Sequence, residues 1–184
     1  MFSALFGGRA SARLAAISSS TAMIEFALDG TIVSANENFL KVMGYTAEDV
    51  IGKHHSLFVD PVYRDSDDYR QFWAKLRRGE FLASEFKRIS KSGKDVWLEA
   101  SYNPIFRGNK PSGVIKIATD ISQKKEEAVE LRGKIEAIGR SQAVIEFAMD
   151  GTVISANKNF LSVMGYGLDA VSYTHLTLPT KRIV

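Results

Sequence analysis

A long internal repeat constrains the fold of this chain more than any other feature of its sequence. Residues 24–45 read IEFALDGTIVSANENFLKVMGY, and residues 145–166 read IEFAMDGTVISANKNFLSVMGY, with no gap between the two copies. Several differences exchange one apolar residue for another of similar volume, which a core position tolerates best. The copies begin about 120 residues apart, and a unit of that length can bury its own core. The repeat therefore indicates two related domains and not a solenoid.

The sequence continues further after the first copy than after the second. The first unit extends to a closing segment near Ser122, whereas similarity between the copies stops near Ser172. We expect residues 22–122 to form one complete domain and residues 143–171 to form a truncated second domain. Residues 172–184, which read SYTHLTLPTKRIV, are expected to be a non-native tail.

The first unit contains five segments with the pattern of strands. Asp29-Gly30 separates the short apolar runs 23–27 and 31–35, and this pair predicts a hairpin. Polar turns that contain Gly separate three further segments with strand character, which are residues 81–89, 96–105 and 112–119. Helical segments lie between the hairpin and these strands. The order predicts an α+β domain with a five-stranded antiparallel sheet and short helices on one face.

The helices of this unit can be placed from their caps and apolar faces. Asn36 and Asn38 can accept hydrogen bonds from free backbone amides, so a helix is expected to start there. A longer helix is predicted over residues 68–78, with Asp67 or Asp68 as its cap. Its apolar face consists of Tyr69, Phe72, Trp73 and Leu76.

Two further helical segments flank the first domain. Residues 1–21 are expected to form an N-terminal helix or cap, because residues 10–20 have high helix propensity. Residues 123–142 carry dense mixed charge and are expected to form a helical linker. A sparse apolar stripe on this linker consists of Val129, Leu131, Ile135 and Ile138. Such a stripe is typical of a helix that pairs with a copy of itself, so we expect a homodimer formed through helices.

Composition excludes several classes of function. The net charge is only +3, with bases and acids interspersed, which does not indicate binding to nucleic acid. The chain has no Cys, which excludes disulfides and thiolate metal sites and fits a cytoplasmic location. No apolar run approaches the roughly 18 residues of a membrane helix, and Arg9 and Arg13 interrupt any signal peptide. Because nucleophile-elbow, Walker, kinase and cyclase signatures are absent from the sequence, we expect no enzymatic activity.

Several spaced motifs of the first unit resemble those of PAS domains. They are Asp29-Gly30, Ser34-Ala35-Asn36, Met43-Gly44-Tyr45, Gly52-Lys53 and the closing Asp120-Ile121-Ser122. The resemblance covers residues 22–122 and resumes at residue 143. It is strongest to tandem PAS domains of cytoplasmic methyl-accepting chemotaxis transducers, including aerotaxis receptors that hold FAD. This implies the PAS fold and a sensor that passes a ligand- or redox-dependent change from its core into a helix.

The same resemblance implies a flavin site. In the aerotaxis domains that the chain resembles, the positions of Asn36, His55 and Trp73 lie near FAD. Leu82 replaces a second Trp of that pattern, which departs from the family. Trp73 could equally belong to the core, because aromatic residues at helical spacing usually do. Asn36 could likewise serve only the start of its helix.

Two alternatives to a flavin remain open. His54 and His55 leave haem as a second candidate cofactor, because imidazole is a common axial ligand of haem iron. Adjacent histidines in a polar loop are also common as surface or capping groups. A core without any cofactor is the second alternative. No set of side chains predicts a metal site.

The remaining candidate residues lie on strands and at the exit of the domain. Asn103 precedes Pro104 in a predicted strand and is a candidate to face the same pocket. Asp120 and Ile121 belong to the exit motif, where the resemblance implies that a signal leaves the sheet.

We therefore expect the sensory module of a bacterial chemotaxis-type transducer, which senses redox state, oxygen or a small ligand. Its chemotaxis output domain is expected to be missing from this sequence. One alternative is a cofactor-free dimerisation or interaction module. Another is the input domain of a histidine kinase or of a cyclic-di-nucleotide enzyme.

Overall fold

The computed structural model describes residues 12–165, and the chain divides into two compact units, Met1–Lys125 and Glu126–Val184. The expectations for residues 1–11 and for the tail at residues 172–184 lie outside the described residues. The domain bounds expected from the sequence stay predictions.

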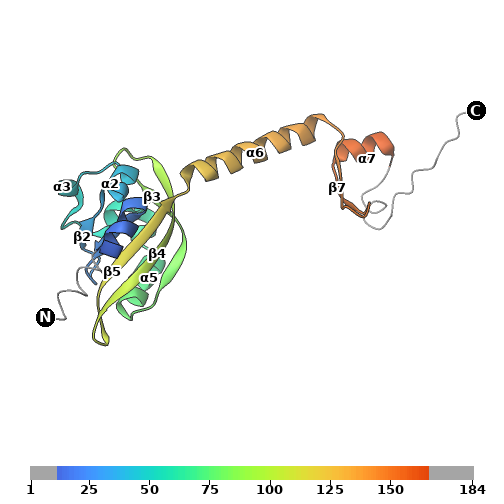
Figure 1. Ribbon diagram of the computed structural model, residues 1–184. Coiled ribbons are helices and arrows are strands. Elements are labelled where there is room, and N and C mark those ends of the chain that lie inside the picture. Colours follow the sequence, from blue (N-terminus) through green and yellow to red (C-terminus); the bar gives the residue numbers. More distant parts are fainter. Residues whose placement is uncertain (1–11, 166–184) are drawn as a thin grey trace, which may run out of the picture. The chain divides into compact units, whose positions relative to one another are not determined.

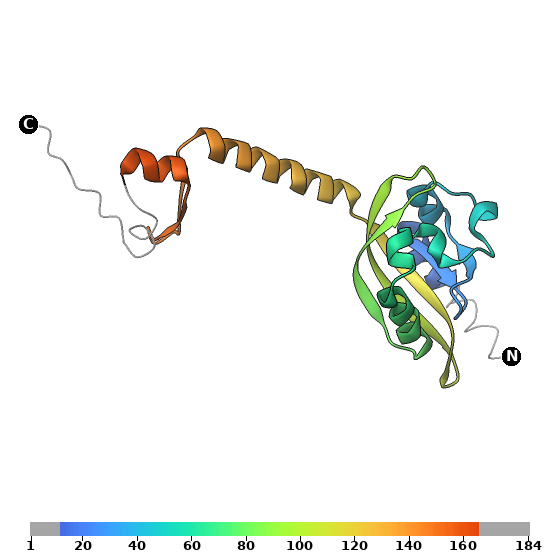
Figure 2. The same cartoon turned by 180° about the vertical axis from the view of Figure 1, so that it is seen from behind.

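The first unit follows the predicted order of strands, helices and strands. After a helix through residues 12–20, its elements are β1 (Ala22–Phe26), β2 (Ile32–Ala35), α2 (Glu37–Met43), α3 (Ala47–Val50), η1 (His55–Phe58), α4 (Pro61–Arg64), α5 (Asp67–Arg77), β3 (Leu82–Ile89), β4 (Asp95–Arg107) and β5 (Lys110–Asp120). The strands form one antiparallel sheet in the order β2-β1-β5-β4-β3. The helices cover one face of this sheet (Figure 1), as the reverse view also shows (Figure 2). The predicted fold class is confirmed.

The helical layer differs from the prediction in two details. The cap of α5 is Ser66, whose hydroxyl accepts a hydrogen bond from the amide of Tyr69, so the expected cap at Asp67 or Asp68 was wrong. The short helices η1 and α4 were not predicted. Pro61 begins α4, as expected for a residue whose fixed backbone angle suits the first helical turn.

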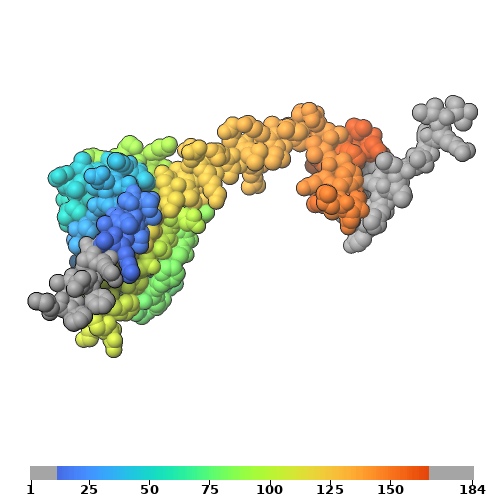
Figure 3. Space-filling view, in the orientation of Figure 1, coloured from blue at the N-terminus to red at the C-terminus, as the bar shows by residue number. Residues whose placement is uncertain are grey.

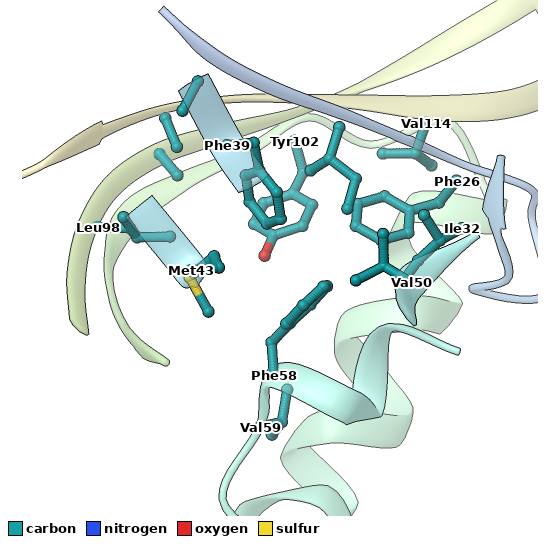
Figure 4. Packing of buried hydrophobic residues seen from close by; sticks show 14 of the residues in the cluster. Phe26, Ile32, Phe39, Met43, Val50, Phe58, Val59, Leu98, Tyr102 and Val114 are labelled. Atoms are coloured by element: carbon teal, nitrogen blue, oxygen red, sulfur yellow. The ribbon is translucent and has the colours of Figure 1, made fainter. Parts of the chain in front are cut away.

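The core lies between the sheet and the helices. Alternation along the strands directs every second side chain toward the helices, and these include Leu98 and Tyr102 of β4 and Val114 of β5, all fully buried. Figure 4 shows these side chains facing Phe39 of α2 and Phe58 of η1. The elements of the unit are therefore held together by one continuous apolar layer.

Asn36 ties the N-terminal helix to the sheet. Its Oδ1 accepts hydrogen bonds from the amides of Met23 and Phe39, both at 2.9 Å. Its Nδ2 donates to the carbonyl groups of Ser18, at 2.9 Å, and Thr21, at 2.7 Å. Figure 3 shows the helix through residues 12–20 against the light-blue surface of the segment that follows β2. The predicted helix start at Asn36 is thus present, and the same side chain also binds the end of the preceding helix.

We call these four hydrogen bonds the Asn36 clamp, and the repeated sequence motif reproduces them in the second unit. Asn157 accepts hydrogen bonds from the amides of Val144, at 3.0 Å, and Phe160, at 2.9 Å. Its Nδ2 donates to the carbonyl groups of Gly139 and Gln142, at 2.7 and 2.6 Å. The two copies therefore share a local structure as well as a sequence.

The second unit contains fewer elements among its described residues. A helix, α6 (Ser122–Ser141), begins in the first unit, and β6 (Ile145–Phe147), β7 (Val153–Ala156) and α7 (Lys158–Met164) follow it. The side chain of Phe147 is 49% exposed, whereas its counterpart Phe26 is 1% exposed. Within residues 12–165, no helix has both the length and the apolar character that a membrane span requires.

The Asn36 clamp predicts an unequal effect of two similar substitutions. Asn36→Ala should lower the free energy of unfolding by about 2–3 kcal/mol, because it removes a helix cap and also leaves the amide of Met23 without its acceptor. Asn38→Ala should cost about 1 kcal/mol, because Asn38 only donates to carbonyl groups. Urea denaturation of both variants measures the difference. Equal losses of stability in the two variants would contradict the role of Asn36 as acceptor for the amides of Met23 and Phe39.

Candidate functional site

A fully buried histidine lies at the centre of the first unit. His54 caps η1, where its ring accepts a hydrogen bond from the amide of Ser56, and the next side chain, His55, turns inward and is 0% exposed. Both ring nitrogens of His55 meet tyrosine hydroxyl groups. Nδ1 lies 2.9 Å from the hydroxyl of Tyr69, and Nε2 lies 3.1 Å from that of Tyr102.

Arg88 sets the direction of these hydrogen bonds. Its Nη2 donates to the hydroxyl of Tyr102 at 3.1 Å. The Tyr102 hydroxyl has one proton, which it can donate to Nε2 of His55. The proton of a neutral His55 then lies on Nδ1 and is donated to Tyr69. The four side chains form one buried chain of hydrogen bonds, from β3 through β4 and η1 to α5.

The surroundings keep the ring of His55 neutral. Burial is the largest cause that holds the pKa of His55 well below its ordinary value, and the positive charges of Arg88 and Lys116 follow. Burial also raises the pKa of Tyr69 to about 12 and raises the pKa of Tyr102. At neutral pH the hydrogen-bonded groups next to Arg88 are therefore a neutral imidazole and two protonated tyrosines.

Trp73 packs against His55 and has an unsatisfied donor. Its ring centroid lies 5.4 Å from that of His55 and 5.8 Å from that of Phe26, edge to face in both cases. The indole Nε1 is buried and makes no hydrogen bond. The indole lies close enough to the hydroxyl of Tyr69 to lower the pKa of Tyr69, which offsets part of the effect of burial. The two groups nevertheless do not have the geometry of a hydrogen bond. A buried donor without an acceptor is costly, and an acceptor on a ligand would satisfy it.

Gly30 makes room for these rings. Its φ is +91°, which side chains rarely allow, and a Cβ here would lie 2.4 Å from Nε2 of His54 and 3.0 Å from Cζ2 of Trp73. The Asp29-Gly30 turn therefore allows α5 and η1 to approach the hairpin closely.

Two buried cations accompany the hydrogen-bond chain. Lys116 of β5 is 2% exposed and Arg88 of β3 is 3% exposed. The Nζ of Lys116 lies 5.0 Å from the ring centroid of Tyr102 and 5.7 Å from that of Phe39. Burial, followed by the charge of Arg88, holds the pKa of Lys116 well below its ordinary value. Across residues 12–165, no ion pair joins either cation to a carboxylate.

The structure brings together two of the four residues expected in a pocket, which are His55 and Trp73. Asn36 instead uses its side chain at the N-terminal helix. Asn103 follows the inward-facing Tyr102 on β4, so its side chain lies on the opposite face of the sheet. There it donates to the hydroxyl of Ser101 at 3.0 Å.

The exit motif ties the start of α6 to β4. The carboxylate of Asp120 accepts a hydrogen bond from the amide of Ser122 at 2.8 Å, and the amide of Ile121 donates to the carbonyl of Trp97 at 2.9 Å. The amide of Trp97 donates in turn to the hydroxyl of Ser122 at 3.0 Å. Lys125 lies over the Trp97 ring at 5.2 Å. The strand that carries Tyr102 in the core therefore also holds the first turn of α6.

The histidines do not fit a haem. His55 has a hydroxyl partner at each ring nitrogen. His54 has the hydroxyl of Ser56 at 2.9 Å and the carbonyl of Asp29 at 3.0 Å. An axial bond to iron would have to replace one of these contacts. Among the described side chains, no cluster of His, Asp and Glu could hold a metal ion.

One feature of the site would suit a flavin, which is the buried Nε1 of Trp73. An aromatic ring system with hydrogen-bond acceptors could both pack against the rings around His55 and accept the free proton of Trp73 Nε1.

Comparison with known proteins gives a consistent picture. The sequence profile of a family described as "PAS domain" matches residues 20–123. The chain is 46% identical over 155 residues to the biofilm dispersion protein BdlA of Pseudomonas aeruginosa, which covers 84% of this chain and 37% of BdlA. It is 30% identical over 114 residues to the aerotaxis receptor of Escherichia coli, which covers 62% of this chain and 22% of the receptor. The chain thus spans well under half of each relative.

A solved structure supports the fold independently. The PAS domain of a protein from Colwellia psychrerythraea superposes with a TM-score of 0.54 at 23% identity, over 61% of this chain and 97% of that domain. At this level of identity, the likeness extends to the fold alone.

The low pKa of His55 predicts a loss of stability in mild acid. The unfolded chain binds a proton at His55 more readily than the folded chain, so the free energy of unfolding should fall as the pH drops from about 7 to about 5. The slope from this group is at most about 1.4 kcal/mol per pH unit. Five titratable or charged groups act on the ring of His55, and they are Tyr69 of α5, Tyr102 of β4, Arg88 of β3, Lys116 of β5 and His54.

Denaturation of His55→Gln and His54→Gln across this pH range isolates the contribution of His55. The dependence should flatten in His55→Gln and persist in His54→Gln. A slope that survives the loss of His55 would contradict the assignment.

Proposed function

The chain belongs to the PAS domain family, and on this premise we propose that residues 22–122 are the sensory module of a bacterial chemotaxis-type signal transducer. The module senses redox state, oxygen or a small ligand in its core and relays the change through α6. Similarity to BdlA and to the aerotaxis receptor supports this proposal. The proposal includes a chemotaxis output domain downstream and a cytoplasmic location. It includes no catalytic step.

The main observation behind this proposal is that β4 has contacts both in the core and at the start of α6. Tyr102 binds both His55 and Arg88 in the core, and Trp97, on the same strand, binds Ile121 and Ser122 at the start of α6. A ligand that changes the contacts of Tyr102 would act on a strand that is also bonded to the exit helix. Asp120 and Ile121 would relay the change, because their contacts define where β5 ends and α6 begins.

FAD is the cofactor that we propose for this core. His55 and Trp73 would contact it, and the free Nε1 proton of Trp73 would bind an acceptor on its ring. Asn36 would act indirectly by fixing the start of α2, and Asn103 by bonding to β4 and β5 from the other face of the sheet. A bound flavin would supply a ring whose charge and hydrogen bonding change with its oxidation state.

A second candidate function is a cofactor-free module that dimerises through α6. The apolar side chains of this helix are all exposed, which favours a partner helix. Leu131, Ile135 and Ile138 form the stripe, because they follow one another at i, i+4 and i+7, whereas Val129 lies on the opposite side of the helix. A second copy of the chain offers the same stripe, so a symmetric pair would cover it. The homodimer is compatible with either function.

Flavin binding tests the leading proposal. The purified chain should retain FAD after incubation and desalting, as measured by the visible absorbance of flavin. Trp73→Phe keeps most of the ring volume but removes Nε1, and it should weaken binding by about tenfold. The matched control Trp97→Phe changes the other tryptophan, on the opposite face of the sheet, and should leave binding unchanged.

Circular dichroism establishes whether each variant is folded. A folded wild-type chain that retains no flavin, but sediments as a dimer, would favour the second candidate. Equal flavin binding by wild type and Trp73→Phe would refute the proposed contact.

A further inference from the structure

A groove of about 640 Å³ follows the edge strand β3, where α4 and the start of α5 approach it. Tyr63 and Phe86 give it an apolar lining on the covered side of the sheet, and Trp97 lines it from the opposite face. Arg88 lines the same groove from the covered face of the sheet. The groove therefore combines an apolar wall with an arginine that is only 3% exposed.

The guanidinium of Arg88 has an unused binding edge. Nη1 donates to the carbonyl of Lys87 at 2.7 Å, and Nη2 donates one proton to Tyr102 at 3.1 Å. The buried Nε has no partner. Arginine is almost never fully buried unless it is paired, because a buried charge without a counter-charge is costly. A ligand that supplies the missing acceptor would remove this cost.

The unused edge has the shape that a carboxylate binds. The same edge of Arg64 binds the carboxylate of Asp65, with Nε at 2.8 Å and Nη2 at 2.9 Å. In Arg88 the Nε proton on this edge has no partner, and Nη2 carries a second proton besides the one that it donates to Tyr102. Paired hydrogen bonds of this kind add both strength and geometric selectivity.

Charges around the groove favour one negative charge over several. Inside, the buried amine of Lys116 lies 5.0 Å from the ring centroid of Tyr102. At the rim, the groove is lined by the carboxylates of Asp60, Asp68, Glu85 and Asp95. Lys87 neutralises Asp95 and Lys125 neutralises Glu85, at 2.7 and 2.5 Å, whereas Asp60 and Asp68 form no ion pair in the described structure. A polyanion would meet more repulsion at the rim than a monoanion with an apolar body.

We propose that Arg88 binds the carboxylate of a small organic monocarboxylate, whose apolar body lies in the groove against Tyr63 and Phe86. The hydroxyl of Tyr102 lies beside this carboxylate and connects it to His55. The inference deepens the proposed sensory function by naming a ligand class, and it rests on that function only for the statement that the ligand is sensed. Binding itself can be measured without any signalling.

Calorimetric titration of the full chain tests the proposal with defined probes. Benzoate and hexanoate should bind, whereas the uncharged benzamide and hexanamide, inorganic phosphate and citrate should bind at least about tenfold more weakly. Arg88→Gln should weaken benzoate binding by about tenfold or more. Arg88→Lys, which keeps the charge but lacks the paired donors, should lie between Arg88→Gln and wild type. Arg64→Gln should bind as wild type does.

A spectroscopic measurement on the wild-type chain removes the dependence on folding of the variants. The nuclear magnetic resonance of the Arg88 Nε–H should shift on addition of benzoate and stay in place with benzamide. No shift, or equal binding of benzoate and benzamide, would overturn the proposal, as would preferential binding of phosphate or citrate. Benzoate binding with no change in α6 would contradict the proposed sensory function and leave this inference intact.

Discussion

The hydroxyl group of Tyr102 occupies the position on which the interior of the domain depends. It accepts a hydrogen bond from Arg88 and contacts His55, which in turn contacts Tyr69. These side chains come from two strands and two helices, so one buried network joins both layers of the fold. Buried polar groups are costly when any member lacks its partner, which makes such a network sensitive to small changes. Because Trp97 lies on the same strand, this sensitivity is located next to the exit helix.

Local features of the fold could be predicted because their causes are local. Asp29-Gly30 forms the predicted turn, since only a residue without a side chain tolerates the backbone angle of Gly30 beside His54 and Trp73. Asn36 starts α2 as expected. The long strands follow from their alternating pattern and from the polar turns between them. The cap of α5 was less predictable, because Ser66 and two aspartates compete within three residues.

The site could be predicted only in part, because its partners come from distant segments. His55 and Trp73 were identified, but the sequence does not show which of two adjacent histidines faces the core. Lys116 and Arg88 were missed, since charged residues in strands usually face solvent. The alternation of Val114, Lys116 and Ala118 on one face of β5 was the available signal, as it places a lysine among buried positions. Its burial beside Tyr102 depends on how β4 and β5 pair, which no single segment encodes.

Amide hydrogen exchange in Tyr102→Phe tests most directly whether the buried network is coupled to the exit helix. The variant removes the hydroxyl on which two buried groups depend, at a cost of about 1–3 kcal/mol. The amides of Ile121 and Trp97 should exchange faster than in wild type, by a larger factor than the amide of Ile32 on the far edge of the sheet. Tyr63→Phe, which removes a hydroxyl outside the network, should leave the exchange rates of Ile121 and Trp97 unchanged. Equal acceleration at Ile32 and Ile121, or unchanged exchange at Ile121, would contradict the account.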